Sequence, residues 1–150
     1  MIQTLVSSIF IGSNTSYIYI WVSKSHKVIY VGMTNGRIGT LGRASQHLDK
    51  RGTLRTNFIN NSGYSIDLTD DFKLLSFKLP QKKEYNSVER SYREAVEFLV
   101  QKQLQILRGT FSPTFDIISN VRPSPRMGNS LVKKSARRIV DQFVAIYNTL

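Results

Sequence analysis

The chain has 150 residues, and its 21 Lys and Arg against 10 Asp and Glu give a net charge of +11. This length suits one domain with its own hydrophobic core, and the excess of cations favours a polyanionic partner, with nucleic acid ahead of a membrane surface. Because the chain has no cysteine and only two histidines, disulfide frameworks, thiolate zinc sites and histidine clusters are excluded.

Residues 17–33 form two apolar runs around a short polar turn, a pattern that predicts a β-hairpin. If residues 23–26 are the turn, Tyr19 lies opposite Tyr30. Side chains alternate between the faces of a strand, so one face collects aliphatic residues suited to a core. The other face collects the polar-tipped rings, with Gly32 leaving space beside Tyr17, Tyr19, Trp21 and Tyr30. Cross-strand aromatic pairs can also stabilise a hairpin without any further role.

The rest of the chain is predicted to contain four helices and one more strand. Residues 34–42 form a Gly-rich loop that lacks the spacing of a phosphate-binding loop. We expect helices at about 40–51, 53–60, 88–107 and 130–148, and a third strand at 71–79. These elements predict a single α+β domain over residues 1–150, with a small three-stranded, mainly antiparallel sheet flanked by helices. The buried stripe expected on the first helix consists of Leu41, Ala44 and Leu48.

Arg43 and His47 are four residues apart on that first helix and therefore share a face, which we expect to differ from the buried stripe. An arginine can hold a phosphate and stabilise the charge that develops on it during cleavage. A histidine can exchange a proton near neutral pH. The same spacing is also typical of a solvated basic helix face.

The carboxylates of the predicted helix 88–107 are Glu89, Glu94 and Glu97. Glu97 follows Val96 at the rim of the apolar stripe, where a carboxylate can point into a site. Glu89 and Glu94 suit the helix dipole as ordinary charges near its N-terminus. Since Mg²⁺ often takes only one or two carboxylates, Glu97 is the candidate metal ligand, and Glu89 is the alternative.

In their order and spacing, these residues resemble the motifs of the GIY-YIG nuclease family over about residues 16–120. "YIY" at 17–19 and "YVG" at 30–32 are similar to the two motifs that give the family its name. Arg43 and His47 match the Arg and His that follow in many members, and Glu97 matches the metal-binding Glu on a helix.

Two positions depart from the family pattern. Tyr17 stands where the family has glycine, and this ring would occupy space in the site. In "PTFD" at 113–116, Asp116 stands where the family has Asn. Either Asp116 or Asn120 would then take the role of that Asn, with Asn129 as a weaker candidate.

The resemblance implies a phosphodiesterase that cleaves DNA with one Mg²⁺ or Mn²⁺ ion, by in-line attack of water, with restriction enzymes among the roles that fit. Tyr19 would take the proton from water, and Tyr30 would orient the phosphate or the water. Arg43 would hold the scissile phosphate, His47 would assist proton transfer, and Glu97 would bind the metal. A tyrosine with an ordinary pKa of about 10 needs help from a neighbouring group for this role.

Further cations are candidates for phosphate contacts along a DNA groove: Lys24, Lys27, Arg37, Lys50, Arg51 and Arg55. Each of them alone is equally well explained as a solvated charge. The basic C-terminal helix could contact DNA or pack its apolar side on the sheet. The alternative function is a non-catalytic nucleic-acid-binding module on the same fold, and either protein could be a monomer or a homodimer. No apolar run is long enough for a membrane span and no signal peptide pattern is present, so we expect a cytoplasmic protein with no membrane partner.

Overall fold

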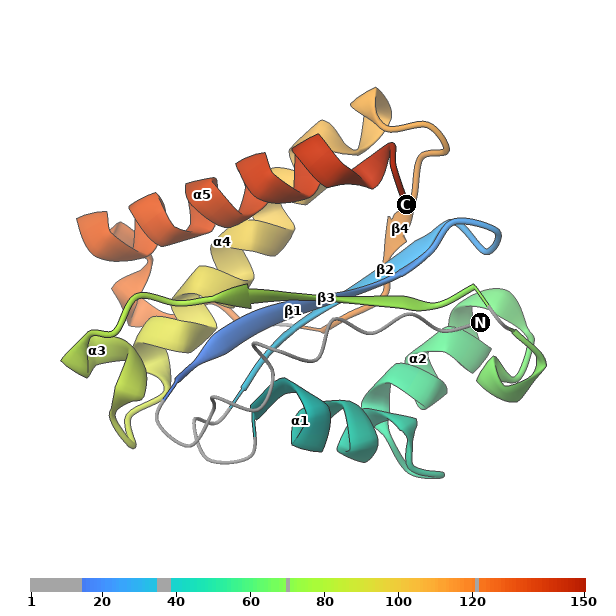
Figure 1. Cartoon of the computed structure of the whole chain (residues 1–150), viewed down its shortest axis with the longest axis horizontal. Coiled ribbons are helices and arrows are strands. Elements are labelled where there is room, and N and C mark those ends of the chain that lie inside the picture. The colour runs from blue at the N-terminus through green and yellow to red at the C-terminus, as the bar shows by residue number, and fades with distance from the viewer. Residues whose placement is uncertain (1–14, 35–38, 70, 121) are drawn as a thin grey trace.

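The computed structural model describes residues 15–34, 39–69, 71–120 and 122–150. Figure 1 shows an α+β fold in which a mixed four-stranded sheet lies between two groups of helices. The strands are β1 (Tyr17–Ser23), β2 (Val28–Met33), β3 (Lys73–Lys78) and β4 (Asp116–Ile117). The helices are α1 (Gly39–Leu48), α2 (Thr53–Ser62), α3 (Lys83–Asn86), α4 (Ser91–Leu107) and α5 (Ser130–Tyr147). The short 3₁₀ turns are η1 (Ile66–Leu68), η2 (Arg108–Thr110) and η3 (Pro125–Gly128).

The sheet has the strand order β3-β1-β2-β4. β1 pairs with β2 and with β3 in antiparallel fashion, so the predicted hairpin and third strand are confirmed. The prediction of only three strands is wrong, because β4 adds to the free edge of β2 in parallel. A two-residue strand has too little alternation for any pattern to be read from the sequence.

The predicted register of the hairpin is wrong by two residues. Tyr19 pairs with Gly32, and Trp21 pairs with Tyr30. The turn is closed by the Lys27 N–H, which donates to the Lys24 carbonyl at 3.2 Å. Because the error is two residues rather than one, every side chain keeps its predicted face.

The shift has a tertiary cause in Asp71, which precedes β3. Its carboxylate accepts hydrogen bonds from the Ser23 hydroxyl at 2.7 Å and from the Ser25 N–H at 2.8 Å. These bonds hold Ser23 at the end of β1, so the turn starts one residue later than predicted. Asp71 lies 48 residues further along the chain than Ser23, so local turn preferences contain no sign of it.

The two faces of the sheet are covered by different helices. The aliphatic face packs against α4 and α5, which lie above the sheet in Figure 1. The ring face packs against α1 and α2 below the sheet, in a core that includes Tyr19, Trp21, Tyr30 and Phe58. The predicted division between an aliphatic face and a ring face is therefore confirmed.

The predicted buried stripe of α1 is wrong in part. Leu48 is 39% exposed, whereas Ala44 and His47 are buried. The face that carries His47 is therefore not separate from the buried face. The physical reason is that α1 covers the polar-tipped side of the sheet, where its Thr40 hydroxyl is hydrogen-bonded to the Ser76 hydroxyl at 2.6 Å.

The two long helices lie close to their predicted bounds. α4 begins three residues later than predicted, because Val88 lies outside it and is 94% exposed. The buried Arg93 side chain donates to the carbonyls of Tyr85 and Ser87 and ties α3 to the first turn of α4. Within the described residues, none of the helices combines the length and the apolar character that crossing a bilayer requires.

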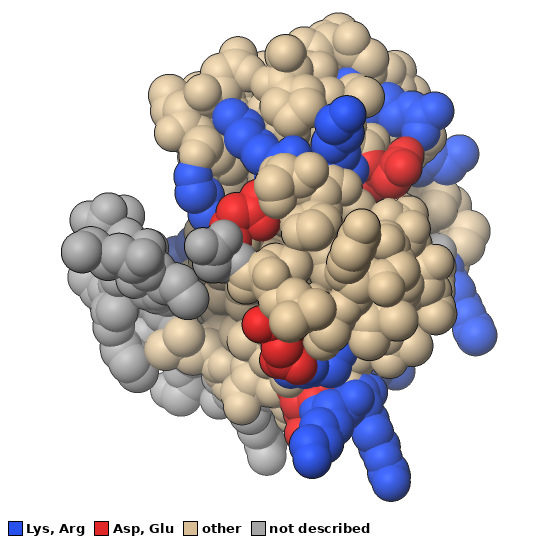
Figure 2. Space-filling model, turned by 90° about the vertical axis from the view of Figure 1, so that its right-hand side faces the viewer, with Lys and Arg blue, Asp and Glu red and all other residues tan. Residues whose placement is uncertain are grey.

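Charged side chains are spread over several parts of the surface. Figure 2 shows the end of the molecule on the right of Figure 1, where Lys and Arg form two groups, one in the upper part and one at the lower edge. Asp and Glu side chains lie beside both groups. On this end, the positive charge is therefore not gathered into one continuous cationic face.

Candidate functional site

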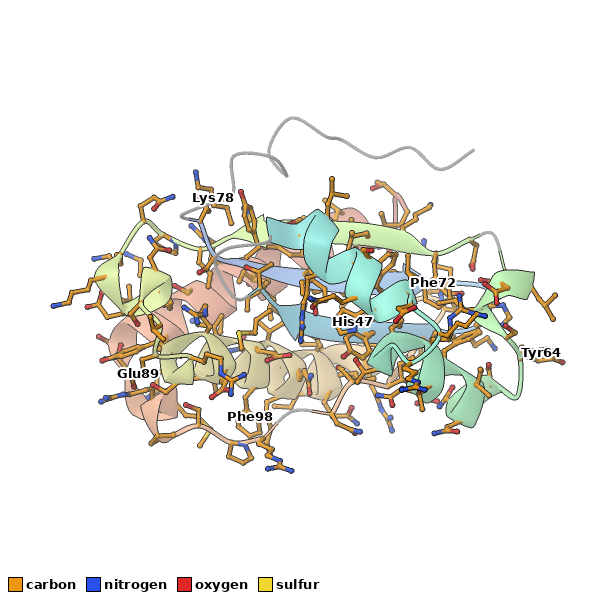
Figure 3. The ribbon with its side chains drawn as sticks, turned by 90° about the horizontal axis from the view of Figure 1, so that it is seen from below. His47, Tyr64, Phe72, Lys78, Glu89 and Phe98 are labelled. Atoms are coloured by element: carbon orange, nitrogen blue, oxygen red, sulfur yellow. The ribbon has the colours of Figure 1, made fainter. Side chains whose placement is uncertain are left out.

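A chain of hydrogen bonds joins the two motif tyrosines on the ring face of the sheet. The Tyr19 hydroxyl is hydrogen-bonded to Nε2 of His47. Nδ1 of the same imidazole lies 2.9 Å from the Thr53 hydroxyl, which lies 3.0 Å from the Tyr30 hydroxyl. Figure 3 looks onto this face, where α1 crosses the strands and His47 lies near its centre. The structure thus joins Tyr19, Tyr30 and His47 in one chain of hydrogen bonds.

Thr53 is a residue of this site that the sequence did not reveal. It is the first residue of α2, and the preceding Gly52 makes the sharp return from α1. A Cβ on Gly52 would overlap the backbone carbonyl of His47, so this close approach requires glycine. The glycine immediately before a helix start was the available signal, but it indicated a turn and not the partner of the following threonine.

Gly32 makes room for the ring of Tyr19. The two residues face each other across β1 and β2, and a Cβ on Gly32 would overlap Cζ and Oη of the Tyr19 ring. The Tyr19 ring is buried and its hydroxyl is held by His47, so it has little freedom to move aside. The glycine of "YVG" therefore determines where the Tyr19 hydroxyl lies.

We expect Gly32→Ala to displace the Tyr19 ring and to lower the free energy of unfolding by about 1–3 kcal/mol, the usual cost of overpacking a core. Urea unfolding measures this loss. Gly109→Ala is the matched control, because a Cβ on Gly109 meets no atom within 4 Å. Equal stability of the two variants would contradict the assigned role of Gly32.

Arg43 contributes a half-buried cation to the same site. Its Nη1 donates to the Gln46 side chain at 2.6 Å, whereas its buried Nε has no hydrogen-bond partner among the described residues. Buried donors without acceptors are uncommon because they lose hydration without replacement. The free Nε–H therefore suits an incoming acceptor such as a phosphate oxygen.

The electrostatics of the site favour neutral forms of its acids and base. Burial, and then the Arg43 charge, lower the pKa of His47 to about 4, so the imidazole is neutral at pH 7. Burial raises the pKa of both Tyr19 and Tyr30 above its usual value. Burial, followed by the charge of Glu94, raises the pKa of Glu97 to about 8, while Arg43 opposes this rise. Glu97 also contributes to the raised pKa values of both tyrosines, which places its carboxyl in the same electrostatic environment.

Glu97 fits the role of a single carboxylate ligand for a divalent ion. No group of three or more Asp, Glu or His side chains that could hold a metal exists among the described residues. A half-buried carboxylate whose charge is disfavoured by burial gains from a neighbouring cation. Mg²⁺ sites with one or two protein carboxylates take their other oxygens from water and phosphate. The alternative ligand Glu89 is exposed, lies before the start of α4 and pairs with Arg126 at 3.5 Å.

The raised pKa of Glu97 predicts a pH-dependent penalty in the metal-free protein. Unfolding lets this carboxyl lose its proton near pH 4.5, whereas the folded protein holds it to about pH 8. Glu97 therefore lowers the free energy of unfolding progressively as the pH rises from about 4.5 to about 8. Between pH 4.5 and pH 8, we expect the free energy of unfolding of Glu97→Gln to rise by about 2–4 kcal/mol relative to that of the unchanged protein, after allowance for partial exposure. Urea unfolding in EDTA at both pH values measures this difference, and a constant difference would contradict the prediction.

The structure separates the two candidates for the family's Asn. Asp116 is exposed, pairs with Arg108 at 3.5 Å and lies opposite Val28, near the hairpin turn. The chain then follows β2, and the Ser119 hydroxyl accepts from the Val31 N–H at 3.0 Å. Asn120 therefore follows next to the end of β2 that carries Gly32, the residue that pairs with Tyr19 on β1.

The six predicted groove cations do not gather around the tyrosines. Lys24 lies on the α5 side of the sheet, 5.0 Å from the ring centre of Tyr147. Arg55 is engaged by an ion pair with Asp67. The other described members are exposed, at the hairpin turn or just after α1, namely Lys27, Lys50 and Arg51. Arg37 lies outside the described residues.

No family model, no curated protein and no solved structure matches this chain. The function is therefore inferred from the residues of the site and their geometry.

Proposed function

We propose that the protein is a metal-dependent DNA endonuclease of the GIY-YIG type, which hydrolyses phosphodiester bonds on the ring face of its sheet. The hydrogen-bonded chain from Tyr19 through His47 and Thr53 to Tyr30 is the observation that carries the proposal. Arg43 and Glu97 share the electrostatic environment of this chain. The net charge of +11 suits a polyanionic substrate.

Tyr19 acts as the base through His47. The raised pKa of its phenol makes tyrosinate a costly resting state. The neutral imidazole can instead accept the phenol proton at Nε2 while the phenol oxygen takes the proton of the attacking water. Burial disfavours the resulting imidazolium, so this step requires the negative charge of the bound phosphate beside His47. The hydroxyl of Tyr19 thus passes one proton on as it receives another.

Thr53 fixes the direction of the hydrogen bonds. With Nε2 of His47 as an acceptor, the neutral ring carries its proton on Nδ1 and donates it to the Thr53 oxygen. The Thr53 hydroxyl then donates to the Tyr30 oxygen. This leaves the O–H of Tyr30 available to donate to a phosphate oxygen or to the attacking water.

Arg43 holds the scissile phosphate through its charge and its unpartnered Nε–H. Glu97 would hold a Mg²⁺ or Mn²⁺ ion, which supplies polarisation of the phosphate and neutralises charge on it. Asn120 is the candidate for a further polar contact to the substrate at the end of β2 that carries Gly32.

Incubation with supercoiled plasmid in Mg²⁺, in Mn²⁺ and in EDTA tests this function. We expect nicked or linear DNA with a divalent ion and none with EDTA. Discrete fragments from longer DNA would indicate a sequence-specific enzyme of the restriction type. The absence of cutting in both metals from pH 6 to pH 9 would overturn the proposal.

One observation favours the alternative, a DNA-binding module without catalysis. Tyr17, which is buried beside Tyr19 on the ring face, takes the place of the family's glycine. Its ring reduces the space beside the proposed base. Salt-sensitive DNA binding without cutting in either metal would support this second function.

A further inference from the structure

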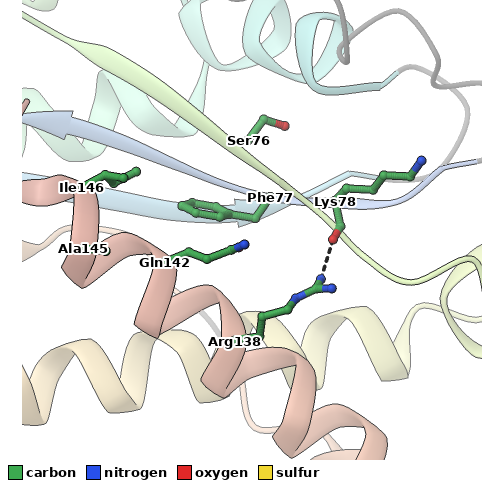
Figure 4. A pocket seen from close by; sticks show the side chains of 7 residues that line it. All are labelled: Ser76, Phe77, Lys78, Arg138, Gln142, Ala145 and Ile146. Atoms are coloured by element: carbon green, nitrogen blue, oxygen red, sulfur yellow. Dashed lines mark hydrogen bonds between the residues drawn. The ribbon is translucent and has the colours of Figure 1, made fainter.

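A groove lies between the edge strand β3 and helix α5. Its volume is about 520 Å³, and Figure 4 shows the residues that line it: Ser76, Phe77, Lys78, Arg138, Gln142, Ala145 and Ile146. β3 is the outermost strand on this side of the sheet. The groove therefore runs along a sheet edge that has no further strand in the described structure.

The groove begins one strand away from the proposed base. Ser76 on β3 lies directly opposite Tyr19 on β1, and Lys78 lies opposite Tyr17. Neighbouring strands are about 4.8 Å apart, and two residues span about 7 Å along a strand. The backbone of Lys78 thus lies within about one or two nucleotide lengths of the backbone of Tyr19.

Cations lie on both sides of this edge. The side chain of Lys78 points away from α5 in Figure 4, toward the side that carries Ser76. Arg138 approaches from α5, and its Nη2 donates to the Lys78 carbonyl at 2.6 Å. Lys134 is exposed one helical turn before Arg138. A phosphate at the edge could therefore meet cations from the strand and from the helix.

The short helix α3 adds two more cations at the same end. The Tyr85 hydroxyl of α3 donates to the Ser135 hydroxyl of α5 at 2.8 Å, which holds the two helices together. Lys82 and Lys83 are exposed at the start of α3. Glu84 is an acidic neighbour in this helix. Positive charge nevertheless dominates the surface, which is formed by Lys78, Lys82, Lys83, Lys134 and Arg138.

We propose that this surface, the edge groove, is a second DNA-binding surface that holds backbone phosphates flanking the scissile one. The DNA passes from Tyr19 over the edge of β3 and along the N-terminal half of α5. The inference rests on the proposed function, because its occupant is the substrate of that function. Charge complementarity selects DNA over an apolar peptide, and contacts of this kind position the DNA without reading its sequence.

The double variant Lys78→Ala, Lys134→Ala tests the proposal in a Glu97→Gln background, in which DNA is bound without being cut. Neither side chain makes a hydrogen bond that the described structure depends on, so the fold is expected to survive. The control is Lys102→Ala, Lys133→Ala, which removes the same charge from α4 and from a position of α5 turned by about 100° from Lys134. Fluorescence anisotropy with a labelled 20-base-pair duplex gives the dissociation constant at several KCl concentrations.

Each lost phosphate contact lowers the slope of log K against log salt by about 0.9, so the test variant should have a slope shallower by about 1.8. The control should keep the slope of the parent. Equal slopes in the test and control variants would overturn the edge groove while leaving the proposed cleavage intact. The unchanged protein could also fail to cut DNA while the test variant shows the shallower slope. That result would support the edge groove as a DNA-binding surface and overturn the proposed nuclease activity.

The absence of native cysteine permits a second, independent measurement. A photo-crosslinker on Lys134→Cys should attach to the bound duplex, whereas the same group on Lys102→Cys should not. Crosslinking from position 102 alone would place the DNA on another face and overturn the proposal.

Discussion

Glu97→Gln is expected to lower the proposed metal-dependent DNA cleavage by about 10³-fold or more, because a bound ion would contribute several kcal/mol of charge stabilisation to phosphoryl transfer. Glutamine keeps the size of the side chain and removes the charge that would bind the ion. DNA affinity should remain, or rise slightly, because the substitution removes a negative charge near a phosphate. Plasmid cleavage and duplex binding measure the two effects separately.

Glu94→Gln is the control for this variant. Glu94 lies on the same helix, three residues earlier, and its carboxylate forms a long ion pair with Arg90 at 3.7 Å. Its charge also raises the pKa of Glu97, so its removal tests the effect of a nearby charge without removing the proposed ligand. Its loss should leave cleavage within a fewfold of the parent rate. Full activity in Glu97→Gln would contradict the assignment of Glu97 as the metal ligand. An equal loss of activity in both variants would indicate a general effect of negative charge.

Tyr19→Phe should lower the cleavage rate by about 10²–10⁴-fold, the usual contribution of a positioned general base. The phenyl ring still fills the space over Gly32, so the fold should lose only about 1 kcal/mol, the cost of one hydrogen bond. Single-turnover cleavage at saturating protein separates this chemical effect from DNA binding.

Two further variants make the assignment of the base specific. Tyr85→Phe removes another buried hydroxyl, which bonds to Ser135 on the opposite side of the sheet, and should leave the single-turnover rate at saturating protein unchanged. Tyr30→Phe should have the smaller effect of the two motif tyrosines, because its hydroxyl reaches His47 only through Thr53. A larger loss in Tyr30→Phe than in Tyr19→Phe would transfer the role of base to Tyr30.

Local sequence patterns were sufficient for the elements and for the two faces of the sheet. Alternation in residues 17–33 predicted which side chains share a face, since a two-residue error in register does not change the face. Helical spacing of apolar residues located α4 and α5 to within a few residues. The types and spacing of Tyr19, Tyr30, Arg43, His47 and Glu97 were likewise visible in the sequence, because each lies in a regular element.

Contacts between distant segments decided the rest, and they follow no local period. Asp71 fixed the register of the hairpin from far along the chain, and β4 joined the sheet through only two residues. The burial of His47 depends on the polar-tipped rings that α1 covers, whereas the hydrophobic pattern of α1 pointed to Leu48 instead. Thr53 joined the site because Gly52 lets α2 return tightly against α1. The sequence by itself determined which chemical groups the protein has and on which faces they lie, and the tertiary structure alone decided which of them touch, because a hydrogen bond depends on distance in space and not on separation along the chain.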